Sequence, residues 1–214
     1  MQRRCGKKID STRKQNNKNL AKRILIVCEG KKTEPNYFRV FNKTSLKSNS
    51  INITIEGAGK NTLSLVEAAV NFGEKAKNDQ YLYSEIWCVF DKDDFSEFNN
   101  AIKKASDKAI KVAYSNPCFE FWYILHFEYL QTALHRDKYK NMLTSRLKTL
   151  TKKKNYQYQK NSKDMYDILL DNQETAINNA KKLLEYHKGK TCSESDPSTT
   201  VHKLIQALKD LSPV

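Results

Sequence analysis

The sequence has no apolar run that approaches the ~20 residues needed to cross a bilayer. Its first residues are basic and polar, and no apolar segment of the signal-peptide kind follows them. These two absences disfavour membrane insertion and secretion. The 39% hydrophobic content is nevertheless sufficient to fill a core. We therefore expect a cytoplasmic protein with no membrane association.

Patterns of cysteine and histidine that build disulfide frameworks or zinc sites are also missing. The five cysteines are odd in number and include no C-x-x-C pair. No H-x-x-x-H or related spacing joins His126 to His202, and we assign packing roles to both. Cys28 and Cys88 lie within apolar runs, which predicts reduced cysteines in the core. A disulfide framework and a zinc knuckle are therefore poorly supported.

Acidic residues are in the minority, with 24 Asp and Glu against 38 Lys and Arg, so the net charge is +14. Residues 1–23 carry nine Lys or Arg and one Asp, which places +8 in that segment and leaves +6 for the rest. A basic excess of this kind favours a polyanionic partner such as nucleic acid. The alternative interpretation is a basic tail that only aids solubility.

Hydrophobic periodicity predicts an α/β fold. Apolar runs predict four strands, at 23–28, 51–55, 85–90 and 110–114. Helical patterns separate these runs, beginning at Thr33, near Asn61 and after Asp94, where Asp94 to Glu97 resembles a capping box. The alternation of strands and helices predicts a mostly parallel four-stranded sheet that is flanked by helices.

The pattern changes after Tyr114 and becomes helical. Further helices are predicted at 118–130, 136–150, 163–188 and 198–211, with a loop at 151–162. The last helix follows Ser198, Thr199 and Thr200, which we expect to cap it. The predicted organisation has three parts: a flexible basic arm (1–22), an α/β core (23–115) and a helical extension packed on the core (116–214).

Carboxylates follow two of the predicted strands at the point where each strand ends. Glu29 and Gly30 follow the first strand, and Asp91 and Asp93 follow the third. The carboxyl edge of an open α/β sheet is where ligands bind, and clustered carboxylates there are most easily neutralised by a hard cation. Residues i and i+2 of an extended segment share a face, so Asp91 and Asp93 can share one ion. We therefore predict a site for Mg²⁺ or Mn²⁺.

Three segments of the chain resemble the RloB-like family, which belongs to the wider Toprim group. The first is Ile24-Leu25-Ile26-Val27-Cys28-Glu29-Gly30-Lys31-Lys32-Thr33-Glu34-Pro35-Asn36-Tyr37-Phe38. The second is Ser115-Asn116-Pro117-Cys118-Phe119-Glu120-Phe121-Trp122, followed by Leu125-His126-Phe127. The third is Asp196-Pro197-Ser198-Thr199-Thr200-Val201-His202-Lys203-Leu204. Together they extend over roughly residues 22–206.

The resemblance implies a Toprim-like, Rossmann-like fold and divalent-metal phosphodiester chemistry. By position, Glu29 matches the strand-end glutamate of Toprim proteins, and Asp91 and Asp93 match their D-x-D pair. Members of the RloB-like family are associated with antiphage defence, often beside an ATPase, and a related system cuts transfer RNA. Toprim motifs usually read E-G-x-x-D, whereas Thr33 and Glu34 stand near that last position here, which leaves the role of Glu34 open.

Other residues complete the predicted site. Glu120 lies in an aromatic helix, where it either faces the acidic edge as a catalytic carboxylate that supplies or supports a metal ligand, or caps a nearby amide or pairs with a lysine. Lys31, Lys32 and Asn116 are candidate contacts to nucleic-acid phosphates, although Asn116 could instead cap the helix that follows it. Tyr156 and Tyr158, set among lysines, are either base-stacking side chains or part of a solvated loop.

Three functions fit these patterns to different degrees. The first is a metal-dependent endonuclease that acts on RNA or DNA as an effector of antiphage defence. The second is a non-catalytic nucleic-acid-binding or sensing subunit that regulates an ATPase partner, and a homo-oligomer is compatible with either. The third is a phosphatase of the haloacid dehalogenase type, which is disfavoured because its D-x-D motif belongs on the first strand and Phe95 occupies the place of its Thr or Val.

Overall fold

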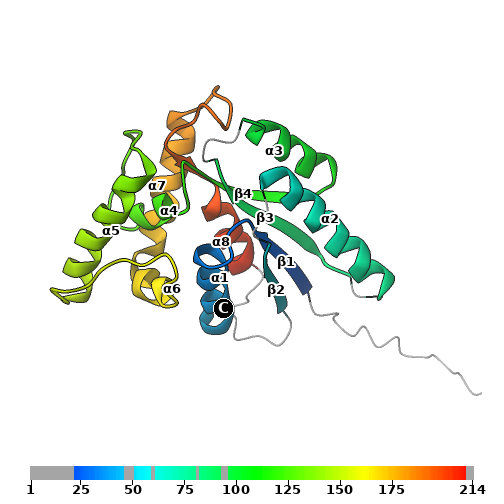
Figure 1. The fold of residues 1–214 in the computed structure, drawn as a ribbon, viewed down its shortest axis with the longest axis horizontal. Helices are drawn as coiled ribbons and strands as arrows, with labels where there is room; N and C mark the ends of the chain where they lie inside the picture. The colour runs from blue at the N-terminus through cyan, green and yellow to red at the C-terminus, as the bar shows by residue number, and fades with distance from the viewer. Residues whose placement is uncertain (1–21, 46–50, 59–60, 81, 93–95, 211–214) are drawn as a thin grey trace, which may run out of the picture.

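The computed structural model describes residues 22–45, 51–58, 61–80, 82–92 and 96–210. Five strands form one sheet in the order β2-β1-β3-β4-β5 (Figure 1). Their bounds are β1 (Lys22–Cys28), β2 (Ile51–Gly57), β3 (Glu85–Asp91), β4 (Lys111–Asn116) and β5 (Ser198–Thr199). The first four are parallel, and β5 pairs antiparallel with the end of β4. The expected α/β fold with a mostly parallel sheet is confirmed.

Helices cover both faces of this sheet. Their bounds are α1 (Thr33–Ser45), α2 (Thr62–Asn78), α3 (Phe98–Asp107), α4 (Glu120–Ile124), α5 (Arg136–Thr151), α6 (Met165–Leu169), α7 (Gln173–Tyr186) and α8 (Val201–Asp210), with a 3₁₀ turn at Leu170–Asn172. Within the described ranges of the chain, no helix is both long and apolar enough to span a bilayer.

The alternation of side chains along β1 separates the core into two layers. Leu25 and Val27 belong to a buried cluster with α2 and α3 on one face of the sheet. Ile24, Ile26 and Cys28 belong to a larger cluster with α1, α8 and the helices α4 to α7 on the other (Figure 1). Since β1 is buried on both faces, a near-continuous apolar run is what its central position requires.

The larger cluster joins the predicted core to the predicted helical extension. It contains Tyr37 and Phe38 from α1 as well as Trp122 from α4 and Leu183 from α7. The extension also supplies β5 and α8 to the sheet and its covering layer. The two parts are therefore held together by a shared aromatic and aliphatic core.

Three details of the expected fold are wrong. The helix expected at 118–130 is only the short α4, which ends at Ile124 and is followed by a turn. The sheet has five strands rather than four, because β5 consists of Ser198 and Thr199 only, too few residues to show periodicity. The helix expected directly after Asp94 begins at Phe98, and its N-cap residue Glu97 makes no capping hydrogen bond. The Glu97 carboxylate instead accepts a hydrogen bond from the Asn100 side chain. Asp94 itself lies outside the described residues.

The strand order creates a crevice at one place along the carboxyl edge. The chain leaves β1 toward β2 on one side and later returns to β3 on the other side of β1. Such a reversal of strand order is the point at which open α/β sheets bind ligands. The ends of β1 and β3, where Glu29 and Asp91 lie, flank that point.

Candidate active site

Glu29 and Asp91 meet at the carboxyl edge of the sheet. The Asp91 backbone N–H donates a hydrogen bond to Glu29 Oε2 (3.2 Å), and Thr62 Oγ1 donates one to Glu29 Oε1 (3.2 Å). The Glu29 N–H donates to the Val89 carbonyl (2.8 Å), which extends the β1–β3 ladder by one residue. The Glu29 carboxylate is therefore fixed across the end of β3.

A cavity of about 380 Å³ lies beside this contact. Four carboxylates from separate parts of the fold line it, and they belong to Glu29, Glu34, Asp91 and Glu120. Four basic side chains line it as well, those of Lys31, Lys32, Arg136 and Lys160. A cavity with acidic residues and basic residues together is suited to a cation and the phosphates that bind to it.

Gly30 allows the Glu34 carboxylate to approach the turn after β1. A Cβ atom on Gly30 would meet both carboxylate oxygens of Glu34, with Oε1 at 2.9 Å. Glu34 lies in the first turn of α1 and is only 6% exposed. A side chain larger than hydrogen at position 30 would therefore displace Glu34 from the cavity wall.

Burial raises the pKa of Glu34 to about 7, and the negative charges of Glu120 and Glu29 add to this effect. Backbone hydrogen bonds at Glu34 and Gly30 act in the opposite direction but do not cancel it. The elevated pKa therefore reflects the burial of this carboxyl first and the neighbouring carboxylates second.

We expect Glu34→Gln to stabilise the protein in excess EDTA, and increasingly so as the pH rises. The native carboxyl keeps its proton up to about pH 7, whereas the unfolded one loses it near 4.5, so wild-type stability falls as the pH rises through this window. The variant should unfold with a free energy higher by about 2–3 kcal/mol at pH 8 and by less than about 1 kcal/mol at pH 5. Urea titrations at both values measure this, and a benefit that is larger at pH 5 would contradict it.

Glu120 is held in the cavity wall by the loop between α5 and α6. It is 5% exposed, and its Oε1 accepts a hydrogen bond from the Tyr158 hydroxyl (3.2 Å) and lies 3.5 Å from Lys160 Nζ. The Lys160 carbonyl accepts a hydrogen bond from Thr33 Oγ1 (2.8 Å), so the same loop is tied to the start of α1. Glu120 therefore lines the acidic cavity and pairs with a lysine, and its part in catalysis stays a prediction.

The sequence did not reveal the contact by which Tyr158 contributes to the candidate active site. It was expected to stack on bases or to lie in a solvated loop, but its side chain is fully buried and its hydroxyl binds Glu120. Both expectations for Tyr158 are therefore wrong. The two residues are 38 positions apart, so no local pattern connects them.

Tyr158→Phe is expected to lower the free energy of unfolding by about 1.5–3 kcal/mol, because it removes a hydrogen bond to a buried carboxylate. Tyr156→Phe is the matched control in the same loop, since that partly exposed hydroxyl contacts neutral groups, Met165 Sδ at 3.9 Å and the Ser162 side chain. Its effect should stay within about 0.5 kcal/mol. Chemical denaturation of both variants measures the loss of unfolding free energy. Equal losses would show that the hydrogen bond between Tyr158 and Glu120 stabilises the fold no more than the contacts of Tyr156 do.

The predicted phosphate contacts are placed differently from one another. Lys31 and Lys32 are exposed and line the carboxylate cavity. Asn116 is 3% exposed and lines a neighbouring cavity, and its amide donates hydrogen bonds to the Ser193 and Ser195 carbonyls (3.2 and 3.1 Å). It does not cap α4, whose N-cap residue is Phe119. The amide of Asn116 thus fastens the loop before β5, and its contact with substrate stays a prediction.

The proposed metal ligands are oxygen donors, as Mg²⁺ and Mn²⁺ prefer. Glu29 and Asp91 are adjacent, and magnesium bound by one or two carboxylates completes its coordination with water. Asp93, the third predicted ligand, lies outside the described residues. Within the described part of the chain, no group of three or more His, Cys, Asp or Glu side chains is arranged to hold a metal ion. The Glu29–Asp91 pair fits such an ion, and the full ligand set stays a prediction.

A family model described as RloB-like protein matches residues 24–208. No curated protein and no solved structure matches the chain. The match covers most of the sheet, both covering layers of helices and all of the described residues that line the carboxylate cavity.

Proposed function

The chain belongs to the RloB-like protein family, and on that premise we propose that it is a metal-dependent endonuclease that cuts the phosphodiester backbone of RNA or DNA. The single observation that carries the proposal is the contact between Glu29 and the end of β3, in a cavity where carboxylates and basic side chains meet. We further propose that it acts in the cytoplasm as an effector of antiphage defence, with transfer RNA among its candidate substrates.

Each group of side chains has a part in the proposed reaction. Glu29 and Asp91 would hold Mg²⁺ or Mn²⁺ through their carboxylate oxygens. Such an ion polarises a phosphodiester and stabilises the leaving oxygen. Lys31 and Lys32, on the exposed side of the cavity, would bind the phosphates of the substrate and set its position relative to the carboxylates.

Glu120 has a supporting part in this proposal. Its carboxylate lines the same cavity as Glu29 and Asp91, and Tyr158 and Lys160 fix its position there. A carboxylate with two such partners can keep its orientation when substrate enters. We therefore assign Glu120 to the catalytic set with Glu29, Asp91 and the undescribed Asp93.

The proposal is tested by incubating the purified protein with transfer RNA, single-stranded DNA and plasmid, in Mg²⁺, in Mn²⁺ and in excess EDTA. We expect cleavage of at least one substrate that requires a divalent ion and is lost in EDTA. Full activity in EDTA would refute the metal-dependent mechanism. The same reactions with an ATPase partner distinguish an effector that needs its partner from one that acts alone.

The alternative is a nucleic-acid-binding or sensing subunit that regulates an ATPase without turnover. Binding of nucleic acid with no cleavage under any of these conditions, with and without the partner, would favour it. The buried position of Glu34 beside the carboxylates of Glu120 and Glu29 favours the nuclease, because a buried carboxylate is costly and a bound cation would offset that cost.

A further inference from the structure

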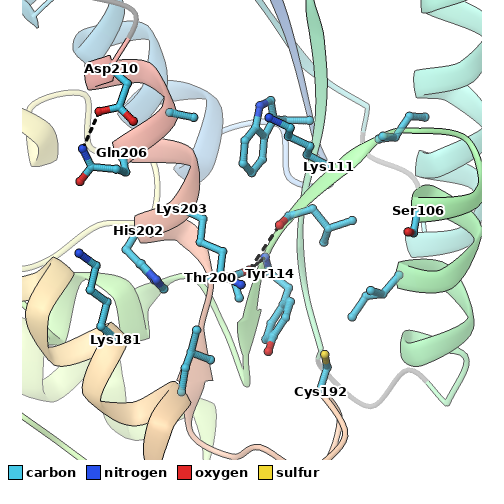
Figure 2. A pocket seen from close by; sticks show the side chains of 16 residues that line it. Ser106, Lys111, Tyr114, Lys181, Cys192, Thr200, His202, Lys203, Gln206 and Asp210 are labelled. Carbon is cyan, nitrogen blue, oxygen red and sulfur yellow. Dashed lines mark hydrogen bonds between the residues drawn. The ribbon is translucent and has the colours of Figure 1, made fainter. Parts of the chain in front are cut away.

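A second cavity, of about 840 Å³, lies along the edge of β4 that β5 leaves uncovered. Figure 2 shows this cavity, with α3 on one side and α7 and α8 on the other. Among the described residues, none lines both this cavity and the carboxylate cavity. The second cavity is therefore separate from the proposed active site.

The floor of this cavity is apolar. It is formed by side chains from β3, β4 and the flanking helices, namely Trp87, Ile102, Ile110, Val112, Leu184 and Ala207. Cavities that bind small molecules typically have volumes of about 300–1,000 Å³, with apolar walls and a few polar groups that orient the ligand. The size and the floor fit a ligand with a planar apolar part.

One wall of the cavity is basic. Lys181 of α7 and His202 and Lys203 of α8 line it together (Figure 2). Among the described residues, neither Lys181 nor Lys203 has a carboxylate within salt-bridge distance. His202 is 4% exposed, and its Nδ1 has no hydrogen-bond partner among the described atoms.

Burial and the charges of the two lysines both act on His202. Its pKa is lowered to about 4, first by burial and then by the charges of Lys203 and Lys181, while a backbone hydrogen bond at Thr199 opposes the shift. The carboxylate that lines the cavity, Asp210, accepts a hydrogen bond from Gln206 (2.8 Å). The basic wall is thus complementary to an anion.

We propose that this cavity binds a nucleoside phosphate, with the phosphate on Lys181, His202 and Lys203 and the base on the apolar floor. The phosphate supplies the negative charge that the wall lacks, and the base covers apolar surface that an inorganic anion would leave exposed. A second copy of the chain is a poor occupant, because it would bring the same lysines against these. The proposal also assigns a role to the third segment that resembles the RloB-like family. His202 and Lys203 belong to that segment and line this cavity, whereas no described residue of the segment lines the carboxylate cavity.

Calorimetric titration of the purified chain in EDTA tests the proposal, with AMP and ATP as probes and adenosine and inorganic phosphate for comparison. We expect AMP to bind with a Kd on the order of 10–100 μM, and adenosine and phosphate to bind more weakly. The double variant Lys181→Gln with Lys203→Gln should weaken AMP binding by about tenfold or more. Both lysines are exposed, so the variant is expected to fold.

Two controls make the result specific. Lys182→Gln with Lys188→Gln removes the same charge from exposed positions in and just beyond α7 that do not line the cavity, and AMP binding should not change. Lys32→Gln alters the carboxylate cavity, and AMP binding should again persist. The proposal is overturned by wild-type protein that does not bind AMP, by inorganic phosphate that binds as tightly as AMP, by a double variant with unchanged affinity, or by a loss of binding in Lys32→Gln.

Discussion

Replacing Asp91 by Asn is expected to lower the rate of metal-dependent cleavage by about a thousandfold or more, because a bound ion contributes several kcal/mol of transition-state stabilisation and each 1.36 kcal/mol is a factor of ten. The fold should be preserved. The hydrogen bond between position 91 and Glu29 Oε2 comes from the backbone N–H and is therefore kept in the variant. Initial rates at saturating Mg²⁺, with thermal unfolding as a check on folding, measure the effect.

Glu29→Gln should reduce cleavage to a similar extent but is a less conservative change. Both oxygens of Glu29 accept hydrogen bonds, from Thr62 and from the Asp91 backbone, and an amide can accept at only one of them. Glu67→Gln is the control, since Glu67 is an exposed residue of α2 paired with Lys104, and its variant should keep wild-type activity. Weakened Mn²⁺ binding in both Asp91→Asn and Glu29→Gln would show that the loss of cleavage follows from loss of the metal ion. Wild-type cleavage by Asp91→Asn would refute the assignment.

The second large effect is expected at Thr199, where Thr199→Val should lower the free energy of unfolding by about 2–4 kcal/mol. The fully buried hydroxyl donates to the Tyr114 carbonyl (2.9 Å), accepts from the Val201 N–H (3.2 Å) and lies 3.1 Å from Ser115 Oγ. Valine has a similar shape but removes the hydroxyl that the Val201 N–H and Ser115 Oγ contact, whereas the Tyr114 carbonyl keeps its hydrogen bond from the Thr200 N–H. A buried polar group that loses its partner costs more than the hydrogen bond itself contributes.

Thr149→Val provides the matched control for Thr199. That hydroxyl is exposed on α5 and donates a long hydrogen bond to the Ser145 carbonyl (3.4 Å), so its loss should change stability by less than about 0.5 kcal/mol. Chemical denaturation of both variants measures the difference. Similar small changes in the two would mean that the β4–β5 junction is not a stabilising element.

The parts of the fold that the sequence predicted are those with strong local signals. The apolar run of Ile24–Cys28 is an internal strand of the sheet with all five side chains fully buried. Helix α2 begins after Asn61, close to the expected start, and the Asn61 side chain caps it. The start of α1 at Thr33 is likewise confirmed. In each case the hydrophobic pattern or the capping residue lies within the element itself.

The parts that could not be predicted depend on distant partners. Thr199 was expected only to cap α8; it does accept the Val201 N–H, but with Ser198 it also forms a strand against β4, more than 80 residues away in the chain. The role of Tyr158 rests on Glu120 and not on its own neighbours. The adjacency of Glu29 and Asp91 was predictable because parallel strands bring their ends to one edge, which needs no knowledge of side-chain contacts.

The loop that carries Tyr158 and Lys160 makes the carboxylate cavity depend on both halves of the chain. A fragment that stopped after β4 would keep Glu29 and Asp91 but would lose Glu120, Arg136 and Lys160 from the cavity, together with the anchor of the loop on Thr33. The two halves of the chain therefore cannot be exchanged independently between relatives by recombination. Split-protein fragments cut at this point would have to reassociate before the cavity exists.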